Sequence, residues 1–578
     1  MNLDNKVSQL AKRRGFYFQS AEAYGGVAGF QTFGPQGAEL KRNIEESWRD
    51  TFSRGLGHRE IEGPTVMPEP VFEASGHLDG FDDMIIECPE CGDNIRADHL
   101  VENFTEIEDA EGYSTEQIEG IIEEHELACP ECGQPLKDEE VNDFNLMFKT
   151  SIGPGSGSTG YLRPETAQGI FTEFPRLKQY ARNQLPFGIT QIGKAYRNEI
   201  SPRKGLVRTR EFTQAELEHF IDSDEDRPDI SDVKDVELKL YTVNEQQSDD
   251  GEYIFATVEE AIEEDIVGVD WVAYYLGIAK KWYKQIGLDM DRFRFRQHQK
   301  GEIAHYASDC WDAEADISGD DEEEEWLEIA GFAHRGCYDL KKHGKHSDDE
   351  REFKIFKEYD EPVTKEETKI DIDMGILGPE YGDKAGKIAE IVEREVRQAP
   401  SVAEDGPIFV HLDDEEYAID SGAVSVSVEE VKKTGEEITP EVIEPSFGVD
   451  RTVYSVLIHA YDEDIIDDEN RKVLHLSNEV APVEVAVFPL MDKEGLGEKA
   501  REIASSLRDL GLNVEYDDSG NIGKRYRRQD EIGTPFCVTV DYETLEEEPS
   551  TVTVRERDST EQERIDIDEL EEYFSSRL

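Results

Sequence analysis

Apolar residues recur at helical spacing near the start of the chain. Leu40, Ile44, Trp48 and Phe52 follow one another at intervals of four within residues 37–55, which puts them on one stripe of a helix. The stretch "EGPTVMPEP" that follows holds three prolines, which lack the backbone donor that a central strand needs. We therefore predict an amphipathic helix that leads into an edge or interface segment.

Alternating patterns predict strands further along. Residues 187–221 have the pattern strand, polar loop "SPRKGLVR", strand, which is typical of a long antiparallel hairpin. From about residue 480 the pattern changes: "VEVAVFPL" predicts a strand, "GEKAREIASSLRDLG" a helix with Leu510 on its apolar face, and "FCVTVD" and "STVTVRER" two more strands. A separate α/β domain over residues 480–578 is expected.

Three stretches are charged or weakly patterned, and we interpret them as insertions. The first holds two "CPEC" pairs around a Glu-rich middle, and another opens with "KKHGKHSDDERE". The expected insertions are 84–146, 222–290 and 342–436, and the catalytic parts between them are 1–83, 147–221, 291–341 and 437–479.

The net charge of the chain indicates the solvent in which the protein works. Acidic residues outnumber basic ones 133 to 62 among 578 residues, giving a net charge of -71 that is spread over the whole length. Self-repulsion of this size is screened in molar salt, where the Debye length is about 3 Å, so we expect a halophile's cytoplasmic protein. The N-terminus lacks an apolar signal core, and no run of about 18 apolar residues occurs, so neither export nor a membrane is expected.

Cations nevertheless gather in "GKAYRNEISPRKGLVRTREF", residues 193–212. In an unbroken strand Arg208, Arg210, Phe212 and Glu216 would share one face, where guanidinium groups grip phosphate, an aromatic ring stacks on a base and a carboxylate holds an ammonium. A solvated ribbon whose charges pair across strands explains the same residues. The pattern alone leaves both readings open.

A second candidate anion site lies in "VIEPSFGVDRTVYSVLIHAY", residues 442–461. Glu444 and Ser446 share a strand face, and the chain turns through Gly448 into a helix with Arg451 near its start. A helix N-terminus with an arginine attracts anions. The alternative is an arginine packed on its own turn.

Cysteines and a basic tail complete the candidate chemistry. Two C-x2-C pairs are the ligand pattern of structural zinc, which we favour over a disulfide pair, free thiols or a catalytic zinc. A cationic island in "GNIGKRYRRQDEIG" could bind RNA or merely balance nearby acids. The zinc candidates are Cys88, Cys91, Cys129 and Cys132, and the basic residues of the tail are Lys524, Arg525, Arg527 and Arg528.

Several strings together resemble a known family. "RNEISPRKGLVRTREF" is similar to motif 2 of the class II aminoacyl-tRNA synthetases, "FGVDR" to motif 3, and the helix running into Pro68 to motif 1. "YLRPETAQGIFTEFPRL", "RFRQH", "AHYASDCWDAE" and "EIAGFAHRGCYDL" resemble the archaeal and eukaryotic type of glycyl-tRNA synthetase from about residue 15 to the C-terminus. The resemblance does not include the helical RNA-binding extension of many eukaryotic relatives, and none is expected here.

The resemblance implies a role for each matching residue. Arg197 would bind the ATP α-phosphate and the charge that develops on it, Arg451 the γ-phosphate, and Phe212 would stack on adenine. The implied ATP site is Arg197, Asn198, Glu199, Arg208, Thr209, Phe212, Glu328, Ile329 and Arg451, with Mg²⁺ near Glu328. The implied glycine site is Glu165, Glu216, Glu444, Pro445 and Ser446. Arg203 and Lys204, in the hairpin loop, would meet the tRNA acceptor end, and the tail would bind the anticodon stem-loop.

The implied protein is a homodimeric, ATP-dependent glycine–tRNA ligase. Its fold would be α+β: a catalytic domain on a mainly antiparallel sheet with flanking helices, a zinc-binding insertion and a C-terminal α/β anticodon-binding domain. Its partners would be glycine, ATP and tRNA(Gly). A catalytically inactive synthetase-like protein, or a class II synthetase for proline, threonine or serine, are the alternatives; the retained arginines and carboxylates disfavour both.

Overall fold

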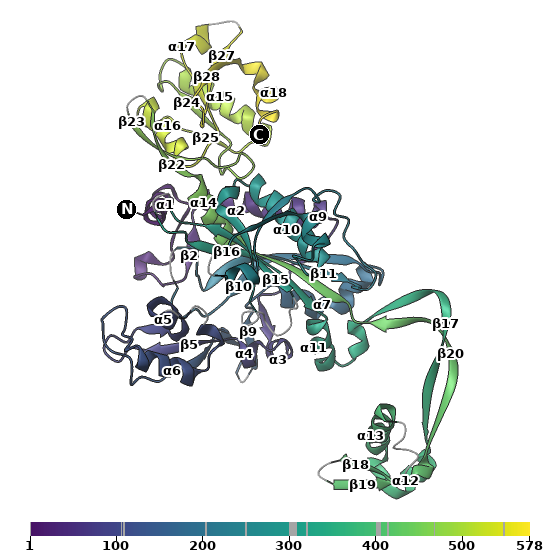
Figure 1. Ribbon diagram of the computed structural model, residues 1–578. Helices are drawn as coiled ribbons and strands as arrows, with labels where there is room; N and C mark the ends of the chain where they lie inside the picture. The colour runs from purple at the N-terminus through teal and green to yellow at the C-terminus, as the bar shows by residue number, and fades with distance from the viewer. Residues whose placement is uncertain are drawn as a thin grey trace. The chain divides into compact units, whose positions relative to one another are not determined.

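The computed structural model of the chain describes most of its length (Figure 1). The described residues are 2–105, 107, 110–155, 157–202, 205–248, 251–299, 309–319, 322–399, 406–412, 415–466, 469–546 and 549–578. They form two compact units: residues 1–353 together with 439–578, and residues 354–438.

A nine-stranded sheet organises the larger unit. In spatial order its strands are β13 (Ile254–Thr257), β12 (Glu237–Tyr241), β14 (Phe293–Gln297), β15 (Asp309–Asp316), β16 (Trp326–Gly336), β21 (Glu441–Gly448), β11 (Glu211–Ile221), β10 (Phe187–Tyr196) and β3 (Arg59–Glu60). Neighbouring strands are antiparallel except at β12–β14 and β10–β3. The expected hairpin of residues 187–221 is the β10–β11 pair.

Helices cover one face of this sheet and bury its core. They are α2 (Pro35–Trp48), which continues as a π-helical segment over Arg49–Gly55, α10 (Asp270–Gln285) and α14 (Val449–Ala460). The predicted apolar stripe of α2 is at most 1% exposed at each of its four positions. Trp48, Phe52 and Trp282 pack around Phe447 of β21 with ring centroids 4.7 to 5.8 Å from it. On the opposite face, β11 and β21 carry the polar side chains Glu216, Glu218, Glu444 and Ser446, and Phe174 packs on Phe220 near the end of β11 with ring centroids 4.9 Å apart.

The structure differs from the expectation at residues 222–290. This stretch is not an insertion, because β12 and β13 extend the central sheet and α10 lies in its core. Val272, Leu276 and Trp282 of α10 are at most 1% exposed. Charged residues on the outer faces of these elements hide an amphipathic pattern.

Shorter elements complete the larger unit around the sheet. The helices are α1 (Leu3–Arg14), α3 (Glu69–Ser75), α4 (His77–Gly80), α7 (Ala167–Tyr180), α8 (Val243–Gln246), α9 (Val258–Glu263) and α11 (Tyr338–His346). The strands are the pair β1 (Tyr17–Gln19) and β2 (Gln31–Phe33), the pair β22 (Tyr461–Ile466) and β23 (Glu469–Leu474), and the three-stranded sheet of β4 (Val66–Pro68), β9 (Ser158–Leu162) and β8 (Lys149–Ile152).

The cysteine-bearing stretch forms a small subdomain with its own core. A three-stranded sheet of β6 (Asn94–Arg96), β5 (Asp82–Glu87) and β7 (Asn142–Asn145) packs with α5 (Ala97–Phe104) and α6 (Thr115–Glu124). Ser114 caps the N-terminus of α6. Its side chain accepts a hydrogen bond from the Gln117 backbone N–H, and the Gln117 side chain accepts one from the Ser114 backbone N–H.

The C-terminal domain is a five-stranded sheet with helices on its faces. Its strands, in order, are β25 (Val514–Tyr516), β24 (Val485–Pro489), β26 (Phe536–Val540), β27 (Thr551–Glu556) and β28 (Gln562–Asp566). Its helices are α15 (Leu496–Asp509), α16 (Ile522–Asp530), α17 (Tyr542–Glu546) and α18 (Leu570–Ser575). Leu510 lies past the end of α15 and is 44% exposed, so its expected place on the apolar face was wrong.

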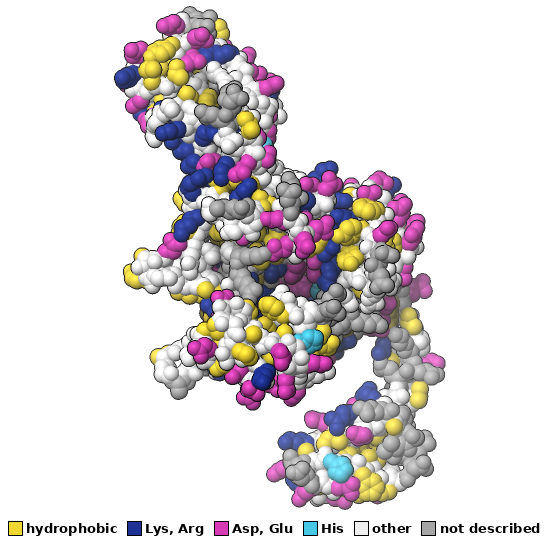
Figure 2. Space-filling view, turned by 60° about the vertical axis from the view of Figure 1, so that its left-hand side comes forward, with side chains coloured by type: hydrophobic (Ala, Val, Ile, Leu, Met, Phe, Trp, Pro, Cys, Tyr) yellow, Lys and Arg dark blue, Asp and Glu magenta, His cyan; other side chains and the backbone are white. Residues whose placement is uncertain are grey.

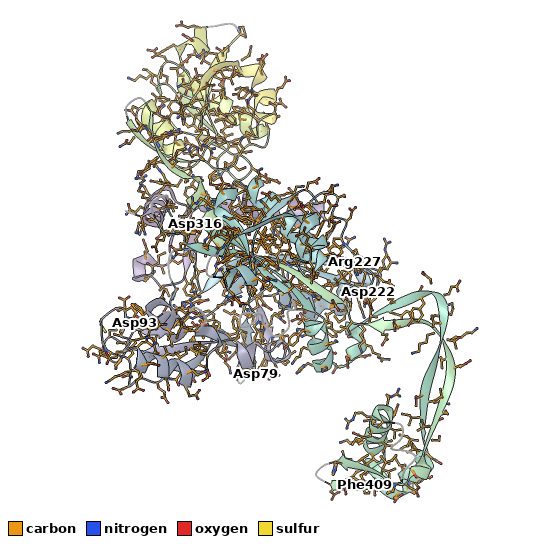
Figure 3. The ribbon with its side chains drawn as sticks, viewed as in Figure 1. Asp79, Asp93, Asp222, Arg227, Asp316 and Phe409 are labelled. Atoms are coloured by element: carbon orange, nitrogen blue, oxygen red, sulfur yellow. The ribbon has the colours of Figure 1, made fainter. Side chains whose placement is uncertain are left out.

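Residues 354–438 form the second unit, a long hairpin that ends in a small cap. The hairpin is β17 (Ile355–Ile372) with β20 (Val424–Ile438), and the cap holds α12 (Met374–Tyr381), α13 (Ala385–Gln398), β18 (Ile408–Leu412) and β19 (Glu415–Ile419). Ile388, Val392 and Val396 of α13 bury one helix face in the cap. Phe409 of β18 points outward there (Figure 3) and is 57% exposed.

Acidic side chains are scattered over every part of the face shown in Figure 2. They follow the even distribution of acid along the sequence. Among the helices that the structure describes, none has the length and apolar character needed to cross a membrane.

Candidate active site

Three neighbouring strands place the motif residues on one face of the sheet. Glu216 of β11 pairs with Ser446 of β21, and Ser446 pairs with Gly331 of β16. Directly opposed residues of antiparallel strands point to the same side. Since Ala215 and Phe447 face the helical core, their neighbours Glu216 and Ser446 face the open side.

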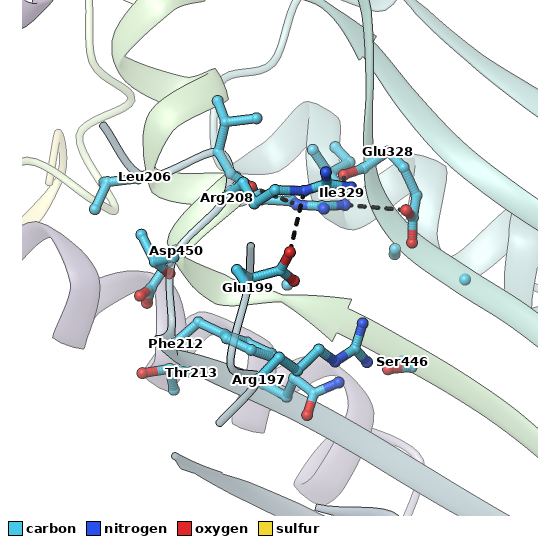
Figure 4. A pocket seen from close by; sticks show the side chains of 17 residues that line it. Arg197, Glu199, Leu206, Arg208, Phe212, Thr213, Glu328, Ile329, Ser446 and Asp450 are labelled. Atoms are coloured by element: carbon cyan, nitrogen blue, oxygen red, sulfur yellow. Dashed lines mark hydrogen bonds and ion pairs between the residues drawn. The ribbon is translucent and has the colours of Figure 1, made fainter. Parts of the chain in front are cut away.

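An arginine-rich cleft opens on this side (Figure 4). The guanidinium carbon of Arg197 lies 5.4 Å from the ring centroids of both Phe212 and Phe81, which is cation–π geometry. Most of the expected ATP residues line the cleft: Arg197, Glu199, Arg208, Thr209, Phe212, Glu328, Ile329 and Arg451. Asn198 does not; its backbone N–H donates to the Leu146 carbonyl at 2.8 Å.

Two further arginines are oriented by neighbours in the cleft. Arg451, in the first turn of α14, donates to the Val207 carbonyl at 3.0 Å and to the Glu328 carboxylate at 3.0 Å. Arg208 lies 3.5 Å from the Glu199 carboxylate. Three guanidinium groups therefore border one cavity, which suits a polyphosphate.

A carboxylate pocket adjoins this cleft along β11 and β21. Glu216, 1% exposed, accepts from the Ser446 hydroxyl at 2.7 Å and from the Ala167 backbone N–H at the start of α7, also at 2.7 Å. The Thr166 hydroxyl donates to the same carboxylate. These donors orient the Glu216 carboxylate in its buried position.

Glu444 and Glu165 complete the pocket. Glu444 accepts two hydrogen bonds from Arg335, at 3.0 and 2.8 Å, and Arg335 also donates to Asp339 at 2.8 and 3.0 Å. Glu165 accepts from the Gln168 amide at 2.7 Å. The arrangement gathers more carboxylates than cations, which favours an ammonium group.

Burial and mutual repulsion shift these carboxylates unequally. Burial, followed by the charge of Glu165, raises the pKa of Glu216. Burial and repulsion by Glu216 and Glu165 outweigh the contact with Arg335 and raise the pKa of Glu444 to about 8. Burial opposes ionisation of Glu165, but His77 and Arg335 outweigh it and lower the pKa of its carboxyl.

Three expected placements need correction. Arg208 and Arg210 precede β11, so they do not belong to its alternating face. Arg210 instead donates to the carbonyls of Glu199, at 2.9 and 3.1 Å, and Ala28, at 3.1 Å. Pro445 lies between Glu444 and Ser446 on β21 and therefore points to the other face, so its ring does not line the pocket.

Sequence reasoning missed several residues of the site. Arg335 lies in the quoted string "EIAGFAHRGCYDL", but only the fold places it beside Glu444. Phe81 lies between α4 and β5, just before the cysteine-bearing stretch, and no pattern links it to Arg197. Glu218 is 0% exposed, and neither of its carboxylate oxygens has a hydrogen-bond partner among the described residues. Burial, then repulsion by Glu444, raises the pKa of Glu218 well above its usual value.

The four cysteines of the CPEC pairs meet in the small subdomain. Cys88 and Cys132 have sulfurs 3.5 Å apart, Cys91 and Cys129 3.7 Å, and all four lie within 4.8 Å of one another. Each pair forms the same turn: Gly92 donates to the Cys88 carbonyl and Gly133 to that of Cys129, with positive φ at both glycines. All four cysteines are free. Two matched turns with four thiols fit a tetrahedral zinc ion.

The basic tail forms most of α16, and part of it is structural. Arg525 is 3% exposed and donates to the carbonyls of Pro489, Asp518 and Gly520, so the expected RNA contact is wrong for this side chain. Arg528 pairs with Asp517, and Lys524 is exposed. Arg203 and Lys204 lie outside the described residues.

Two family models match separate parts of the chain. Residues 154–247 match the tRNA synthetase class II core domain (G, H, P, S and T). Residues 484–577 match the anticodon binding domain.

Similar proteins span the whole length. A glycine–tRNA ligase of Methanothrix thermoacetophila is 48% identical over 98% of this chain and 96% of its own. A glycine–tRNA ligase of Methanocaldococcus jannaschii is 44% identical over 99% of this chain and 98% of its own length. One of Archaeoglobus fulgidus is 46% identical over 98% of this chain and 95% of its own length. A crystal structure of prolyl-tRNA synthetase from Cryptosporidium parvum shares the fold, with TM-score 0.50 and 12% identity over 99% of this chain and 75% of that one. The chain belongs to the glycine–tRNA ligase family of class II aminoacyl-tRNA synthetases.

Proposed function

We propose that the cleft joins glycine to ATP and then passes the glycyl group to tRNA(Gly). The observation that carries this proposal is the adjacency of two sites on one sheet face. Arg197, Arg208 and Arg451 border the cleft, and Glu216 and Ser446 extend the same face into the carboxylate pocket. A polyphosphate and an ammonium can thus be held side by side.

In the first step the glycine carboxylate attacks the α-phosphorus of ATP and pyrophosphate leaves. Arg197 would bind the α-phosphate oxygens, where negative charge develops, and Arg451 the γ-phosphate. Phe212 would stack on adenine. A charged donor held ready for the transition state is worth about 10² to 10³ in rate. Arg197 is therefore the main electrostatic catalyst of the proposed reaction.

Glycine would be selected by charge and by lack of space. Glu216, Glu444 and Glu165 would surround its ammonium. Two hydrogen bonds from Arg335 hold the Glu444 carboxylate in place in the lining of the pocket. A larger amino acid would push its side chain into these buried carboxylates. Such steric rejection exceeds the ~1 to 3 kcal/mol that an apolar pocket gains per methylene, so no editing site is required.

In the second step a ribose hydroxyl of the tRNA 3′-terminal adenosine attacks the glycyl carbonyl and AMP leaves. The nucleophiles of both steps belong to substrates, so this chain need only orient them and stabilise charge. The exposed Lys524 and the half-buried Arg527 on α16 are proposed anticodon-arm contacts.

Two metal ions fit the residues present. Mg²⁺ would bind with the ATP phosphates near the Glu328 carboxylate, which suits a hard cation, and would screen phosphate charge. Zn²⁺ would bind Cys88, Cys91, Cys129 and Cys132 and hold the small subdomain together. The turns around these cysteines present four thiols at one point, which supports a closed structural site.

We further propose a homodimer that forms at the β3 edge of the sheet. This edge carries an apolar hollow whose lining includes Leu56, Tyr180, Phe187 and Tyr274. Tyr180 is 73% exposed, and an aromatic residue at an open edge suits a second copy. Light scattering of the purified chain tests this assignment: a mass of one chain per particle would reject it.

We also propose a cytoplasmic protein adapted to molar salt. The net charge of -71 supports this, since salt screens the repulsion. Melting temperature should rise with KCl, and a flat or falling profile would contradict the proposal.

Charging of tRNA with labelled glycine tests the function directly. The purified chain should form acid-precipitable glycyl-tRNA that depends on ATP. Charging with proline, threonine or serine instead would favour another class II activity, and no charging with any amino acid would favour an inactive synthetase-like protein.

A further inference from the structure

A second cluster of metal-binding side chains lies on the active-site face of the sheet, apart from the four-cysteine site. His298 follows the end of β14, and Cys310 and Asp312 belong to β15. One donor atom from each lies within 4.8 Å of the others. The His298 imidazole Nε2 is 2.7 Å from the Asp312 carboxylate.

The strand ladder explains why these three residues meet. The backbone N–H of His298 donates to the Cys310 carbonyl at 3.0 Å, which continues the β14–β15 pairing by one step beyond Gln297 and Trp311. Residues two apart on one strand share a face, so Cys310 and Asp312 point to the same side. The cluster therefore rests on regular backbone, which limits how far its donors can spread.

We propose that His298, Cys310 and Asp312 bind a divalent transition-metal ion of the zinc type. Imidazole, thiolate and carboxylate are the donors that such an ion accepts, and three protein ligands leave a fourth position open. Tetrahedral coordination at usual bond lengths sets donor atoms roughly 3.3 to 3.6 Å apart. The present donors need only small side-chain movements to reach that spacing.

The cluster lies on the same face of the sheet as the glycine pocket. Asp312 pairs with Gly331 of β16, Gly331 pairs with Ser446, and Ser446 with Glu216, so one cross-strand row runs from the cluster to the pocket. Gly331 contributes no side chain to this row, and a Cβ at its position would lie 3.7 Å from the Asp312 carboxylate. At ~4.8 Å per strand, Asp312 and Ser446 are about 10 Å apart. A water molecule or a substrate hydroxyl fits the fourth position.

Carboxylates and arginines both surround the cluster. Asp312 feels the repulsion of Glu328 and Glu314, and Cys310 that of Glu444. Arg296 lies opposite Asp312 in the ladder, and Arg294 is paired with Glu314 at 2.6 Å. A divalent ion would replace the hydrogen bond between His298 and Asp312 and bind the Cys310 thiolate directly. In its absence His298 and Asp312 form the hydrogen-bonded pair described above.

Metal content of the full-length chain tests the site. Cys310→Ser and Asp312→Asn, dialysed against dilute zinc chloride, should each hold about one ion fewer per chain than the unmodified protein. Cys337→Ser is the matched control, because Cys337 is also a single, half-buried cysteine outside both clusters. Equal zinc content in all four proteins would overturn the proposal. The test compares the zinc content of each variant with that of the unmodified protein, so its result does not depend on whether the four-cysteine site is filled. It also requires no aminoacylation activity.

A second measurement uses the unmodified chain and so does not depend on a variant folding. Zinc chloride should slow alkylation of Cys310 by iodoacetamide, read by peptide mass spectrometry, and leave the alkylation rate of Cys337 unchanged. Equal slowing at both cysteines, or none at Cys310, would show a hydrogen-bonded cluster without a metal.

Discussion

The Ser446 hydroxyl donates a hydrogen bond of 2.7 Å to the Glu216 carboxylate across the ladder between β21 and β11. The contact joins the strand before α14 to the strand after the cation-rich loop. It fixes a buried carboxylate at the boundary between the arginine-lined cleft and the carboxylate pocket. Several tests follow from this geometry.

Ser446→Ala should weaken glycine binding selectively. Loss of one donor to a buried carboxylate costs about 1 to 3 kcal/mol, so the KM for glycine should rise roughly 5- to 150-fold while the KM for ATP changes little. Ser455→Ala serves as the control, because the Ser455 hydroxyl is buried on α14 and has no hydrogen-bond partner among the described residues. An equal rise in both KM values would contradict this role of Ser446.

Arg197→Ala should reduce the rate of adenylate formation by about 10² to 10³ and leave the melting temperature near that of the unmodified chain. Lys194→Ala, at a position of β10 three residues before Arg197, removes a positive charge that pairs with Glu211 at 3.5 Å, and should retain activity. Single-turnover measurement of glycyl-adenylate gives the rates. Comparable losses in both variants would mean that general charge, and not the position of Arg197, matters.

Glycine binding should strengthen as pH rises from 7 to 9. The pKa of Glu444 is raised to about 8, so its carboxyl is largely protonated at pH 7 and ionises across this range, which increases attraction for the glycine ammonium. The KM for glycine should therefore fall with pH. Glu444→Gln should have a higher KM that no longer falls; a parallel fall in this variant would assign the pH effect to another group.

The two neighbours Lys524 and Arg525 should separate RNA binding from stability. Arg525→Ala leaves buried carbonyls without their donor and should cost about 2 to 3 kcal/mol in the free energy of unfolding. Lys524→Ala should leave stability unchanged and weaken tRNA binding. Urea denaturation and filter binding measure the two effects. Unchanged tRNA affinity in Lys524→Ala would remove this residue from the proposed RNA surface.

Loss of the proposed zinc ion should loosen the small subdomain before the rest of the chain. Cys132→Ser takes away one of four thiols, so limited proteolysis should begin within residues 84–146, whereas Cys337→Ser should be cut like the unmodified chain. Identical digestion patterns in all three proteins would argue against a structural metal there.

Helices and strands with a strong local sequence pattern were predicted from the sequence. The apolar stripe of α2, the β10–β11 hairpin and, in the C-terminal domain, the predicted helix α15 and strands β24, β26 and β27 all have short-range signals, and the structure contains each of them. The cleft residues Arg197, Phe212 and Arg451 could be named because they lie within two recognisable motifs. Their physical grouping still required the pairing of β11 with β21 and β16.

Long-range contacts escaped prediction. Arg335 contacts Glu444, which is 109 positions away in the sequence, and Phe81, which lies between α4 and β5, contacts Arg197, so no spacing rule predicts either contact. The prediction for residues 222–290 was wrong because charged outer faces obscured the apolar face of α10, which packs on the central sheet and on Phe52. Arg525 was misread because a cation among acids looks exposed until its carbonyl partners are known.

Amino-acid-dependent exchange of pyrophosphate into ATP, measured in molar KCl across all twenty amino acids, tests the central claim most directly. The reaction isolates the first step and needs no tRNA. Joint binding of an ammonium by Glu216 and Glu444 and of phosphates by Arg197 and Arg451 predicts exchange with glycine and far less with alanine or serine. Exchange that is absent with glycine, or equal with alanine, would contradict it.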